Sequence, residues 1–489
     1  MSIDSRTVRP GEVFWCLPGS RQNGHSFAAQ ALSRGARACV VSEDSVFRQL
    51  PQAAIRVPAV EQALTRFAAW YRQQQPARVI GVTGSVGKTT TRELLWHALS
   101  TTLRGSRSPR NWNNHLGVPL SLCGIERSHA FAVLELGASE SGEIARLARL
   151  ATPEIAVITA VGLAHVAGFG SREQIIHEKG SLVAALPADG LAVLNGDDPA
   201  VRAMARRTSA RVILAGEQPH NSLRATDVEF FANQLRFTVD STRFELNVPG
   251  RHFLLPALLA VAVAREFGIP LALVAEGLRQ FVPVAGRCRL ETIGPWTVID
   301  DSYNASPESM TAASQLLAAR QPAGEGRRIF VAGDMLELGP LAANCHFDLG
   351  GQIARAGIDL LAVCGEFASQ VKQGALAAGM QPVQIAAGQR IGTVTSALEN
   401  WLGDGDTILV KGSRGMRLER VTGWLREQAL ARAASAANPA ATTERASLQS
   451  DTAHPQQLSP AQPGMQHLSG PARNSASRSE QVPSVPAGG

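Results

Sequence analysis

The sequence predicts an α/β protein built from three domains and followed by a disordered tail. Its 489 residues exceed what one hydrophobic core holds, since domains usually contain about 100–200 residues. From residue 77 onward, short continuous apolar runs alternate with amphipathic segments, which is typical of a parallel sheet covered by helices. From about residue 431 the composition narrows to Ala, Ser, Pro, Gln and Gly, which cannot bury a core.

The expected domains differ in their strand patterns. Residues 1–75 predict a small α/β module, with a strand at ACVVSED and a glutamine-rich linker at its end. Residues 76–285 predict a central P-loop-type domain with a parallel sheet, in which ARVIGVTG, AFAVLELG and EIAVITAVG are buried strands and TTRELLWHALST is a helix. Residues 286–430 predict a Rossmann-like domain, with strands at WTVIDDS, RRIFVAGD, LLAVCGE and DTILVKGS. Residues 431–489 form the tail, for which an inert role is favoured over a functional one.

Composition argues against several classes of protein. Hydrophobic residues make up 45% and charged residues 18% of the chain, as in ordinary globular proteins, and the sequence offers neither a signal peptide nor a run long enough for a membrane anchor. The net charge of +6 is spread along the chain and aromatic residues are only 5%, so nucleic-acid binding has little support. The six cysteines form no C-x-x-C pair, which argues against a zinc site or a disulfide framework. We therefore expect a cytoplasmic protein with free thiols and no membrane anchor, and a monomer.

The stretch GVTGSVGKTTT ends the first central strand and predicts a phosphate-binding loop. The common pattern G-x-x-x-x-G-K-[ST] would place its first glycine where Val82 stands, and this chain has Gly84 instead. Gly84 and Gly87 let backbone N–H groups approach phosphate oxygens, and the helix that starts near Thr89 directs its positive dipole at them. Lys88 adds a point charge, and the Thr89 hydroxyl can bind Mg²⁺. The alternative is a chance glycine turn, which the strand before and the helix after disfavour.

The central domain carries further candidate ligands, because ligands of open α/β sheets bind beyond the carboxyl ends of the strands. Glu135 lies inside an apolar strand, where a carboxylate is costly unless it binds a metal or forms an ion pair. His165 follows the next strand and is either a ligand or a hydrogen-bonded loop residue. For Lys179, helical spacing alone favours a solvated residue, because carbamylation by CO₂ needs a neutral amine and hence a lowered pKa.

Two strand ends of the third domain add polar candidates. Asp300 and Asp301 are adjacent in IDDSYNASPESM, and helix capping explains Ser306 but not this pair. Ser413 and Arg414 lie in VKGSRGM after another strand, where arginine could clamp a carboxylate or phosphate in bidentate fashion. A solvated turn is the alternative for Arg414.

Together these motifs resemble those of the Mur ligases, ATP-dependent amide-forming enzymes of peptidoglycan synthesis. The resemblance covers about residues 1–425 and rests on TGSVGKTTT, NWNNHLGVPLSL, LELGASESGEIARL, GFGSREQIIHEKG, DDSYNASPESM, GDMLELG and VKGSRGM, in this order. The family's loop is T-G-x-x-G-K-[TS], which accounts for the glycine missing from the common pattern. DDSYNASP and GDMLELG are most similar to the branch that joins D-alanyl-D-alanine to UDP-N-acetylmuramoyl-tripeptide.

The resemblance implies a reaction and its cofactors. The γ-phosphoryl group of ATP moves to the terminal carboxylate of the tripeptide, and the amine of D-alanyl-D-alanine attacks the acyl phosphate. Mg²⁺, with two ions, and a carbamylated lysine are implied as cofactors. Closure of the third domain would keep water from the acyl phosphate.

The resemblance also assigns roles to residues by their motifs. The implied contacts to the ATP phosphates are Gly84, Ser85, Val86, Gly87, Lys88, Thr89, Thr90 and Arg287, with Asp301 at the ribose and Asn304 beside the nucleotide. The implied metal ligands are Thr89, Glu135, His165 and Lys179 as its carbamate. The implied catalytic set is Lys88, Glu135, His165, Lys179 and Arg287. The implied substrate contacts are Ser5 and Arg6 for UDP, through DSRTVRPG and NGHSF, and Asn111, Asn114, Ser413 and Arg414 elsewhere.

The chain departs from the family pattern in three places. The family's G-x-H-N-x-x-N-A near the adenine is GRHFLLPALLA here, so His252 stays while Phe253 and Pro256 replace two asparagines, and adenine recognition is expected to change. The family has a strand ahead of DSR where this chain has almost nothing, which suggests a trimmed UDP-binding module or a misplaced start codon. Asn23 stands where aspartate is common.

Other functions remain open at this point. A sister ligase, which adds one amino acid to a UDP-muramoyl peptide or glutamate to folate, is disfavoured by DSYNASP and GDMLELG. A catalytically silent nucleotide-binding relative is suggested by the changed adenine box and disfavoured by the joint presence of Lys88, Glu135, His165, Lys179 and Asp301. A simple ATPase would leave two domains without a purpose. The sequence does not fix whether the third residue of the tripeptide is diaminopimelate or lysine.

Overall fold

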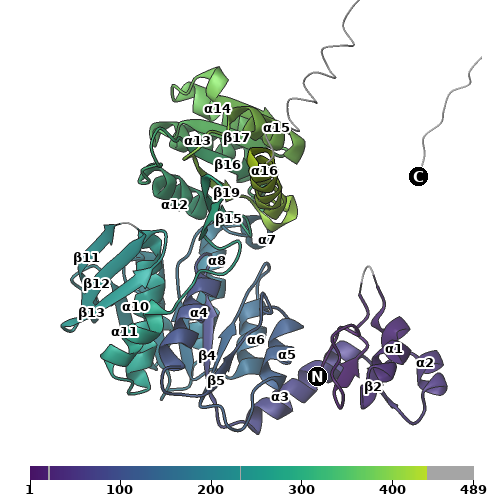
Figure 1. Ribbon diagram of the computed structural model, residues 1–489. Coiled ribbons are helices and arrows are strands. Elements are labelled where there is room, and N and C mark those ends of the chain that lie inside the picture. The colour runs from purple at the N-terminus through teal and green to yellow at the C-terminus, as the bar shows by residue number, and fades with distance from the viewer. Residues whose placement is uncertain (20–21, 232, 438–489) are drawn as a thin grey trace, which may run out of the picture. The chain divides into compact units, whose positions relative to one another are not determined.

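Four β-sheets and their helices make up the part of the chain that the structure describes, residues 1–19, 22–231 and 233–437 (Figure 1). In this computed structural model, Met1–Arg432 form one compact unit. The expected α/β class with parallel sheets is confirmed. The domain boundaries at 75 and 285 stay a prediction.

The first sheet has three parallel strands, β1 (Val13–Trp15), β2 (Ala38–Val41) and β3 (Ala54–Arg56). Its helices are α1 (Ala28–Ser33), α2 (Asp44–Gln49) and α3 (Val60–Gln73). The strand β2 matches the one predicted at ACVVSED. Ahead of DSR, Ser2 forms a single parallel bridge to Phe14, so pairing with the sheet begins there.

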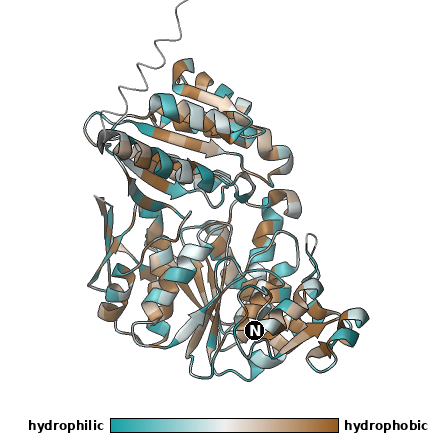
Figure 2. Cartoon of the chain, turned by 45° about the vertical axis from the view of Figure 1, so that its right-hand side comes forward, coloured by the Kyte–Doolittle hydropathy of each residue, from teal (hydrophilic) through white to brown (hydrophobic). Residues whose placement is uncertain are grey.

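The second sheet has seven strands, all parallel, in the order β10-β9-β8-β7-β4-β6-β5. They are β4 (Arg78–Thr83), β5 (Gly105–Arg107), β6 (Phe131–Glu135), β7 (Ile155–Ile158), β8 (Leu191–Asn195), β9 (Arg211–Gly216) and β10 (Leu223–Arg224). The strands β6 and β7 are buried along their whole length, and their residues are apolar apart from the final Glu135. Brown, hydrophobic strands lie among helices that carry the teal, hydrophilic colour in Figure 2. Because β6 and β7 flank β4, the three predicted ligand-bearing strand ends are neighbours.

The helices of this part of the chain are α4 (Lys88–Leu99), α5 (Gly117–Cys123), α6 (Glu143–Ala151), α7 (Val166–Phe169), α8 (Arg172–Ala184), α9 (Pro199–Ala203), α10 (Leu254–Glu266) and α11 (Leu271–Arg279). The apolar run FLLPALLAVAVA lies mostly in α10, which is buried against the core. Across the described ranges, no helix combines the length and the apolar character that crossing a bilayer requires.

The third sheet is antiparallel and was not predicted. It consists of β11 (Thr226–Phe231), β12 (Gln234–Val239) and β13 (Thr242–Asn247). In β12 every second residue is buried, namely Leu235, Phe237 and Val239. Residues 76–285 therefore contain more than a parallel sheet, and the period of two in these strands is the signal that the sequence analysis overlooked.

The fourth sheet has the strand order β14-β15-β19-β16-β17-β18, in which only β14 is antiparallel to its neighbour. Its strands are β14 (Arg289–Ile293), β15 (Trp296–Asp301), β16 (Arg328–Gly333), β17 (Leu360–Cys364), β18 (Ile385–Gly388) and β19 (Thr407–Lys411). Its helices are α12 (Pro307–Ala318), α13 (Ala342–Arg355), α14 (Ala368–Ala377), α15 (Ile391–Trp401) and α16 (Glu419–Ala437). The four predicted strands are present, and β15 lies beside β19, so the DDSYN and KGSRG segments leave one sheet edge together.

The last helix runs across the boundary expected at residue 431. Helix α16 extends to Ala437. Its alanine-rich last turns favour a helix, because alanine has the highest helix propensity. The remainder of the predicted tail, 438–489, lies outside the described residues.

Arg72 fastens helix α3 to the central sheet. Its buried guanidinium donates to the carbonyl oxygens of Ala151 at 3.0 Å and Gln75 at 3.2 Å, and to Glu154 Oε1 at 2.7 Å. The second oxygen of Glu154 accepts from the Val79 amide at 2.7 Å. One arginine thus ties the helix to the start of β4.

Arg72→Ala should lower the free energy of unfolding by about 2–4 kcal/mol, because it leaves buried acceptors without a donor. Urea unfolding followed by circular dichroism measures the change. Arg66→Ala on the exposed face of α3 is the control and should stay within about 0.5 kcal/mol of the parent chain. Equal losses in the two variants would contradict the anchoring role of Arg72.

Candidate functional site

The phosphate loop between β4 and α4 adopts a conformation that needs both of its glycines. The backbone φ angle is +150° at Gly84 and +83° at Gly87, values that residues with a side chain rarely adopt. A Cβ on Gly84 would lie 1.9 Å from Oγ1 of Thr159. Thr159, which follows β7, donates its hydroxyl to the Val86 carbonyl at 2.6 Å. The neighbouring strand therefore fixes the shape of the loop.

The loop brings a cation and a helix start to one place. Helix α4 begins at Lys88, so Thr89 and Thr90 belong to its first turn, where backbone N–H groups lack helical partners. The Lys88 ammonium donates to the carbonyls of Gly84 at 2.6 Å and Ser85 at 3.1 Å. These contacts hold the positive charge against the backbone of the loop, where a phosphate group would meet it.

Glu135 is a buried carboxylate that links strand β6 to helix α4. Its side chain is 2% exposed. Oε2 accepts from Thr89 Oγ1 at 2.9 Å and lies 3.3 Å from Arg92 Nη1, while Oε1 accepts from Asn113 Nδ2 at 2.9 Å. The structure thus brings Thr89 and Glu135 together and adds Asn113 and Arg92, which the sequence analysis missed.

Lys179 is buried in helix α8, which corrects the solvated position that spacing alone favoured. Its residue is 2% exposed, and its ammonium lies 5.5 Å from the centre of the Phe169 ring. Burial lowers the pKa of Lys179 to about 7, and repulsion from Lys88 adds to this, while Glu178 and Glu143 act in the opposite direction. A large share of the amine is therefore neutral near pH 7, the form that carbamylation requires.

His165 lies close enough to Lys88 and Lys179 for their charges to act on its imidazole. Burial lowers the pKa of His165, Glu337 raises it, and Lys88 and Lys179 lower it, so the two lysines act on the imidazole. Its Nδ1 contacts the carboxylate of Glu337 in the GDMLELG segment. With Nδ1 on a carboxylate, Nε2 is the ring nitrogen left for a ligand role, as in many metal-binding histidines.

Adjacent aspartates at the end of β15 have different surroundings. Asp301 Oδ2 accepts from the Lys411 ammonium at 2.6 Å, and the same ammonium donates to the Asn304 carbonyl at 2.9 Å. Asp300 is buried and accepts from the Gly286 amide at 3.1 Å, so it orders the backbone ahead of β14. Lys411, at the end of β19, is a further residue that the sequence analysis missed.

Tyr303 lies beside both arginines of the predicted site in this domain. The guanidinium carbon of Arg287 is 4.0 Å and that of Arg414 is 5.4 Å from the centre of its ring, within the range of cation–π attraction. Ser413 is buried, and its hydroxyl accepts from the Leu336 amide at 2.9 Å, so it holds the GDMLELG segment in place.

The candidates nearer the N-terminus take part in local structure. Ser5 Oγ donates to Gln30 Oε1 at 2.7 Å, and the exposed Arg6 forms a bidentate pair with Asp4. These contacts leave the predicted UDP contacts untested.

The loop before α5 carries two more candidates. Asn111 and Asn114 are both exposed, and Asn114 Oδ1 accepts from the Gly117 amide at 2.9 Å at the start of that helix. In the changed adenine box, Phe253 and Pro256 are buried, and the Phe253 ring packs 4.6 Å from His252. Neither buried residue offers the amide that an asparagine would present.

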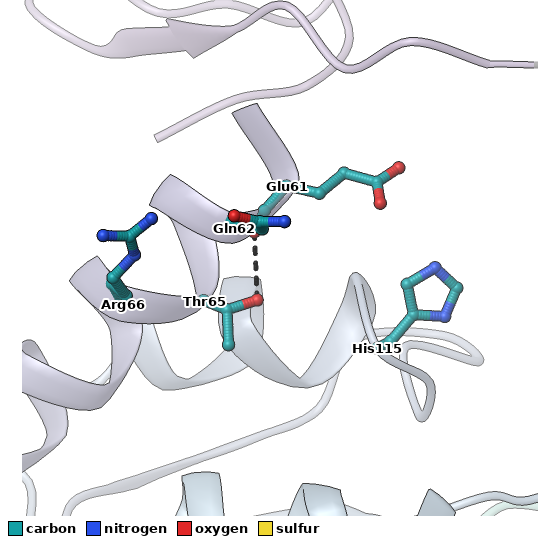
Figure 3. A pocket seen from close by; sticks show the side chains of 5 residues that line it. All are labelled: Glu61, Gln62, Thr65, Arg66 and His115. Carbon is teal, nitrogen blue, oxygen red and sulfur yellow. Dashed lines mark hydrogen bonds between the residues drawn. The ribbon is translucent and has the colours of Figure 1, made fainter. Parts of the chain in front are cut away.

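Two cavities differ in their chemistry. The larger, about 360 Å³, is lined by Glu61, Gln62, Thr65, Arg66 and His115 (Figure 3). The side chains of Arg66 and His115 point away from one another, and Thr65 donates its hydroxyl to the Glu61 carbonyl at 3.0 Å. The smaller, about 150 Å³, is lined by Ala164, His165, Asn304, Ala305, Ser306, Leu336, Glu337, Leu338, Ser413, Arg414 and Gly415. The smaller cavity contains the predicted site residues His165, Ser413 and Arg414, so we assign the candidate active site to this cavity and to the phosphate loop.

A phosphate loop at the carboxyl edge of a parallel sheet, followed by a Rossmann-like domain, defines a nucleotide-binding α/β enzyme. Three domain models of one family match this chain: Mur ligase family, catalytic domain, at residues 1–72; Mur ligase middle domain at 82–264; and Mur ligase, glutamate ligase domain, at 286–414. The chain belongs to the Mur ligase family.

Relatives and solved structures agree with this assignment. The UDP-N-acetylmuramoyl-tripeptide--D-alanyl-D-alanine ligase of Bacillus subtilis (strain 168) is 34% identical over 424 residues, 86% of this chain and 92% of that protein. A crystal structure of MurF from Acinetobacter baumannii superposes with a TM-score of 0.77 at 30% identity, over 87% of this chain and 93% of that one. The crystal structure of MurF from Thermotoga maritima in complex with ADP superposes with a TM-score of 0.75 at 27% identity, over 88% of this chain and 98% of that one. The predicted three-domain fold and the ATP-dependent ligase class are thus confirmed at the level of the family.

Gly84→Ala should weaken binding of a fluorescent ATP analogue by about 10–100-fold, because the new Cβ would strike Thr159 and strain the loop. Fluorescence titration measures the affinity. Gly392→Ala in helix α15 is a matched control, since a Cβ there meets no atom within 4 Å. Unchanged affinity in Gly84→Ala would show that the loop does not depend on this close approach.

Lys179→Met should raise the free energy of unfolding near pH 7, and this gain should shrink toward pH 10. The pKa of about 7 in the folded chain lies below the ordinary value of 10.5, so between these values the unfolded chain holds a proton that the folded chain lacks. The free energy of unfolding of the parent chain therefore rises with pH between about 7 and 10.5. Below about pH 7 the folded chain bears the full cost of burying a charged lysine. Urea unfolding at several pH values in CO₂-depleted buffer measures the trend. A gain independent of pH would point to packing as its cause.

Proposed function

We propose that this chain joins D-alanyl-D-alanine to the tripeptide carboxylate of UDP-N-acetylmuramoyl-tripeptide, with ATP converted to ADP and phosphate. The observation that carries the proposal is the match to a Bacillus subtilis ligase named for these substrates, over 86% of this chain and 92% of that protein. The motifs DDSYNASP and GDMLELG support the same branch of the family. A cytoplasmic location is part of the proposal, because the reaction needs ATP, and the six unpaired cysteines suit a reducing compartment.

The chemistry asks the protein to activate a carboxylate that an amine cannot attack directly. A carboxylate oxygen attacks the γ-phosphorus of ATP. The bond between this phosphorus and the oxygen that bridges the β- and γ-phosphates breaks, which yields an acyl phosphate and ADP. The dipeptide amine then adds to the acyl carbon, phosphate leaves, and the nitrogen loses a proton. Lys88, the start of α4 and Arg287 supply positive potential for the charge on the phosphoryl oxygens.

The donors beside the phosphate loop fit Mg²⁺. Thr89 offers a hydroxyl and Glu135 a carboxylate, 2.9 Å apart, at the start of α4. Within residues 1–19, 22–231 and 233–437, no group of three or more His, Cys, Asp and Glu side chains is placed to hold a metal. Mg²⁺ commonly binds through one or two carboxylates, water and substrate phosphates, so two protein ligands here suffice. Bound Mg²⁺ would neutralise phosphate charge.

A second ion and a carbamate on Lys179 belong to the same proposal. His165 offers Nε2, and burial gives Lys179 the lowered pKa that reaction with CO₂ needs. A carbamate would turn this cationic side chain into an anionic oxygen donor, which suits a hard metal ion. The monomeric state remains a prediction.

One observation favours a second candidate, a nucleotide-binding relative without turnover. Phe253 and Pro256 are buried where the family presents asparagines near the adenine. The buried Lys179 and the paired Thr89 and Glu135 favour an active enzyme, because burying an ionisable lysine and a carboxylate inside a protein is costly.

Phosphate release distinguishes these candidates. The protein is supplied with ATP and Mg²⁺, and UDP-N-acetylmuramoyl-tripeptide and D-alanyl-D-alanine are added separately and together. Release that needs both, with a UDP-N-acetylmuramoyl-pentapeptide found by mass, is the expected result. Tripeptides that end in diaminopimelate or in lysine are compared to fix the substrate. ATP binding without turnover on any pair would favour the silent relative.

A further inference from the structure

Asn113 connects the loop before α5 to the end of strand β6. Its side-chain amide donates to Glu135 Oε1 at 2.9 Å, and its carbonyl accepts from the Gly137 amide at 2.8 Å. The backbone N–H of Asn113 donates to the Asn111 carbonyl at 2.8 Å. A Cβ on Gly137 would lie only 3.0 Å from Asn113 Cγ, so the amide group is packed as well as hydrogen-bonded. These contacts fix both the backbone and the side chain of Asn113.

The two oxygens of Glu135 have different partners. Oε1 is occupied by the neutral amide of Asn113, whereas Oε2 is directed at the Thr89 hydroxyl on α4. Arg92 lies 3.3 Å from Oε2 but makes its shorter contact, 2.7 Å, to Glu93 Oε1. The guanidinium is thus shared with a second carboxylate, and Asn113 orients Glu135 without cancelling its charge.

We propose that Asn113 is a positioning residue that sets the plane of the Glu135 carboxylate and so presents Oε2 to Mg²⁺. This inference rests on the metal role of Glu135 under the proposed function. Residues that hold a metal ligand commonly change metal affinity by about 10–100-fold when they are replaced. Asn113 also lies in the loop that carries Asn111 and Asn114, so the metal ligand and that loop share one anchor.

The test compares nucleotide affinity with and without Mg²⁺. A fluorescent ADP analogue is titrated into the full chain and into Asn113→Ala, in EDTA and over a series of Mg²⁺ concentrations, with no acceptor substrate. In Asn113→Ala the Mg²⁺ concentration needed for the gain in affinity should rise by about 10–100-fold. The affinity in EDTA should stay unchanged, because the Lys88 ammonium is held by the Gly84 and Ser85 carbonyls, whereas the Asn113 amide donates to Glu135.

Asn247→Ala is the matched control, since Asn247 is an exposed residue at the end of β13. An unchanged Mg²⁺ requirement in Asn113→Ala would overturn the inference. An equal loss of affinity in EDTA and in Mg²⁺ would overturn it too, because it would indicate a structural role. If the unmodified chain showed no gain from Mg²⁺, the inference would fall with the metal role of Glu135, while the phosphate-release assay would judge the ligase activity separately.

Discussion

The central domain depends on one buried charge, the Glu135 carboxylate. Placing an ionised carboxylate in a protein interior costs several kcal/mol unless hydrogen bonds and nearby charges offset it. Here the offset comes from Thr89 on α4, Asn113 on the loop before α5, and the guanidinium of Arg92. The hydrogen bonds to this one carboxylate thus hold the end of β6, the start of α4 and the loop before α5 together, beside the phosphate loop.

Two lysines show how the site concentrates positive charge. Burial lowers the pKa of Lys88, with Glu135 opposing this and Arg287 adding to it, and Lys88 in turn lowers the pKa of Lys179. Cations held together in this way repel one another, and each is more stable when an anion arrives. A phosphate group would relieve the repulsion at Lys88, whereas Lys179 can relieve it by losing its proton. The same electrostatic strain thus favours anion binding at one lysine and a neutral amine at the other.

The sequence was sufficient for the parts of the fold and site that follow from local pattern. Continuous apolar runs predicted β4, β6 and β7, and strand ends in a parallel sheet had to meet at one edge. The antiparallel sheet was not predicted, because the expectation for residues 76–285 rested on continuous apolar runs, and β11–β13 alternate polar and apolar residues instead. Thr159, Lys411 and Tyr303 were missed because only the fold brings them to their partners, and Lys179 was misjudged because helical spacing does not report burial.

Three residues that are not evident from the sequence, Asn113, Thr159 and Tyr303, are neutral, and this explains their use. Asn113 orients Glu135, Thr159 supports the phosphate loop, and Tyr303 lies against Arg287. Each is neutral, so each fixes a functional group without an ion pair that would cancel its charge. A phosphoryl-transfer site needs its charges both fixed in place and available to the substrate, and an ion pair meets only the first need. The ion pair between Asp301 and Lys411 has a different use, because the ammonium also donates to the Asn304 carbonyl and so orders the backbone that follows β15.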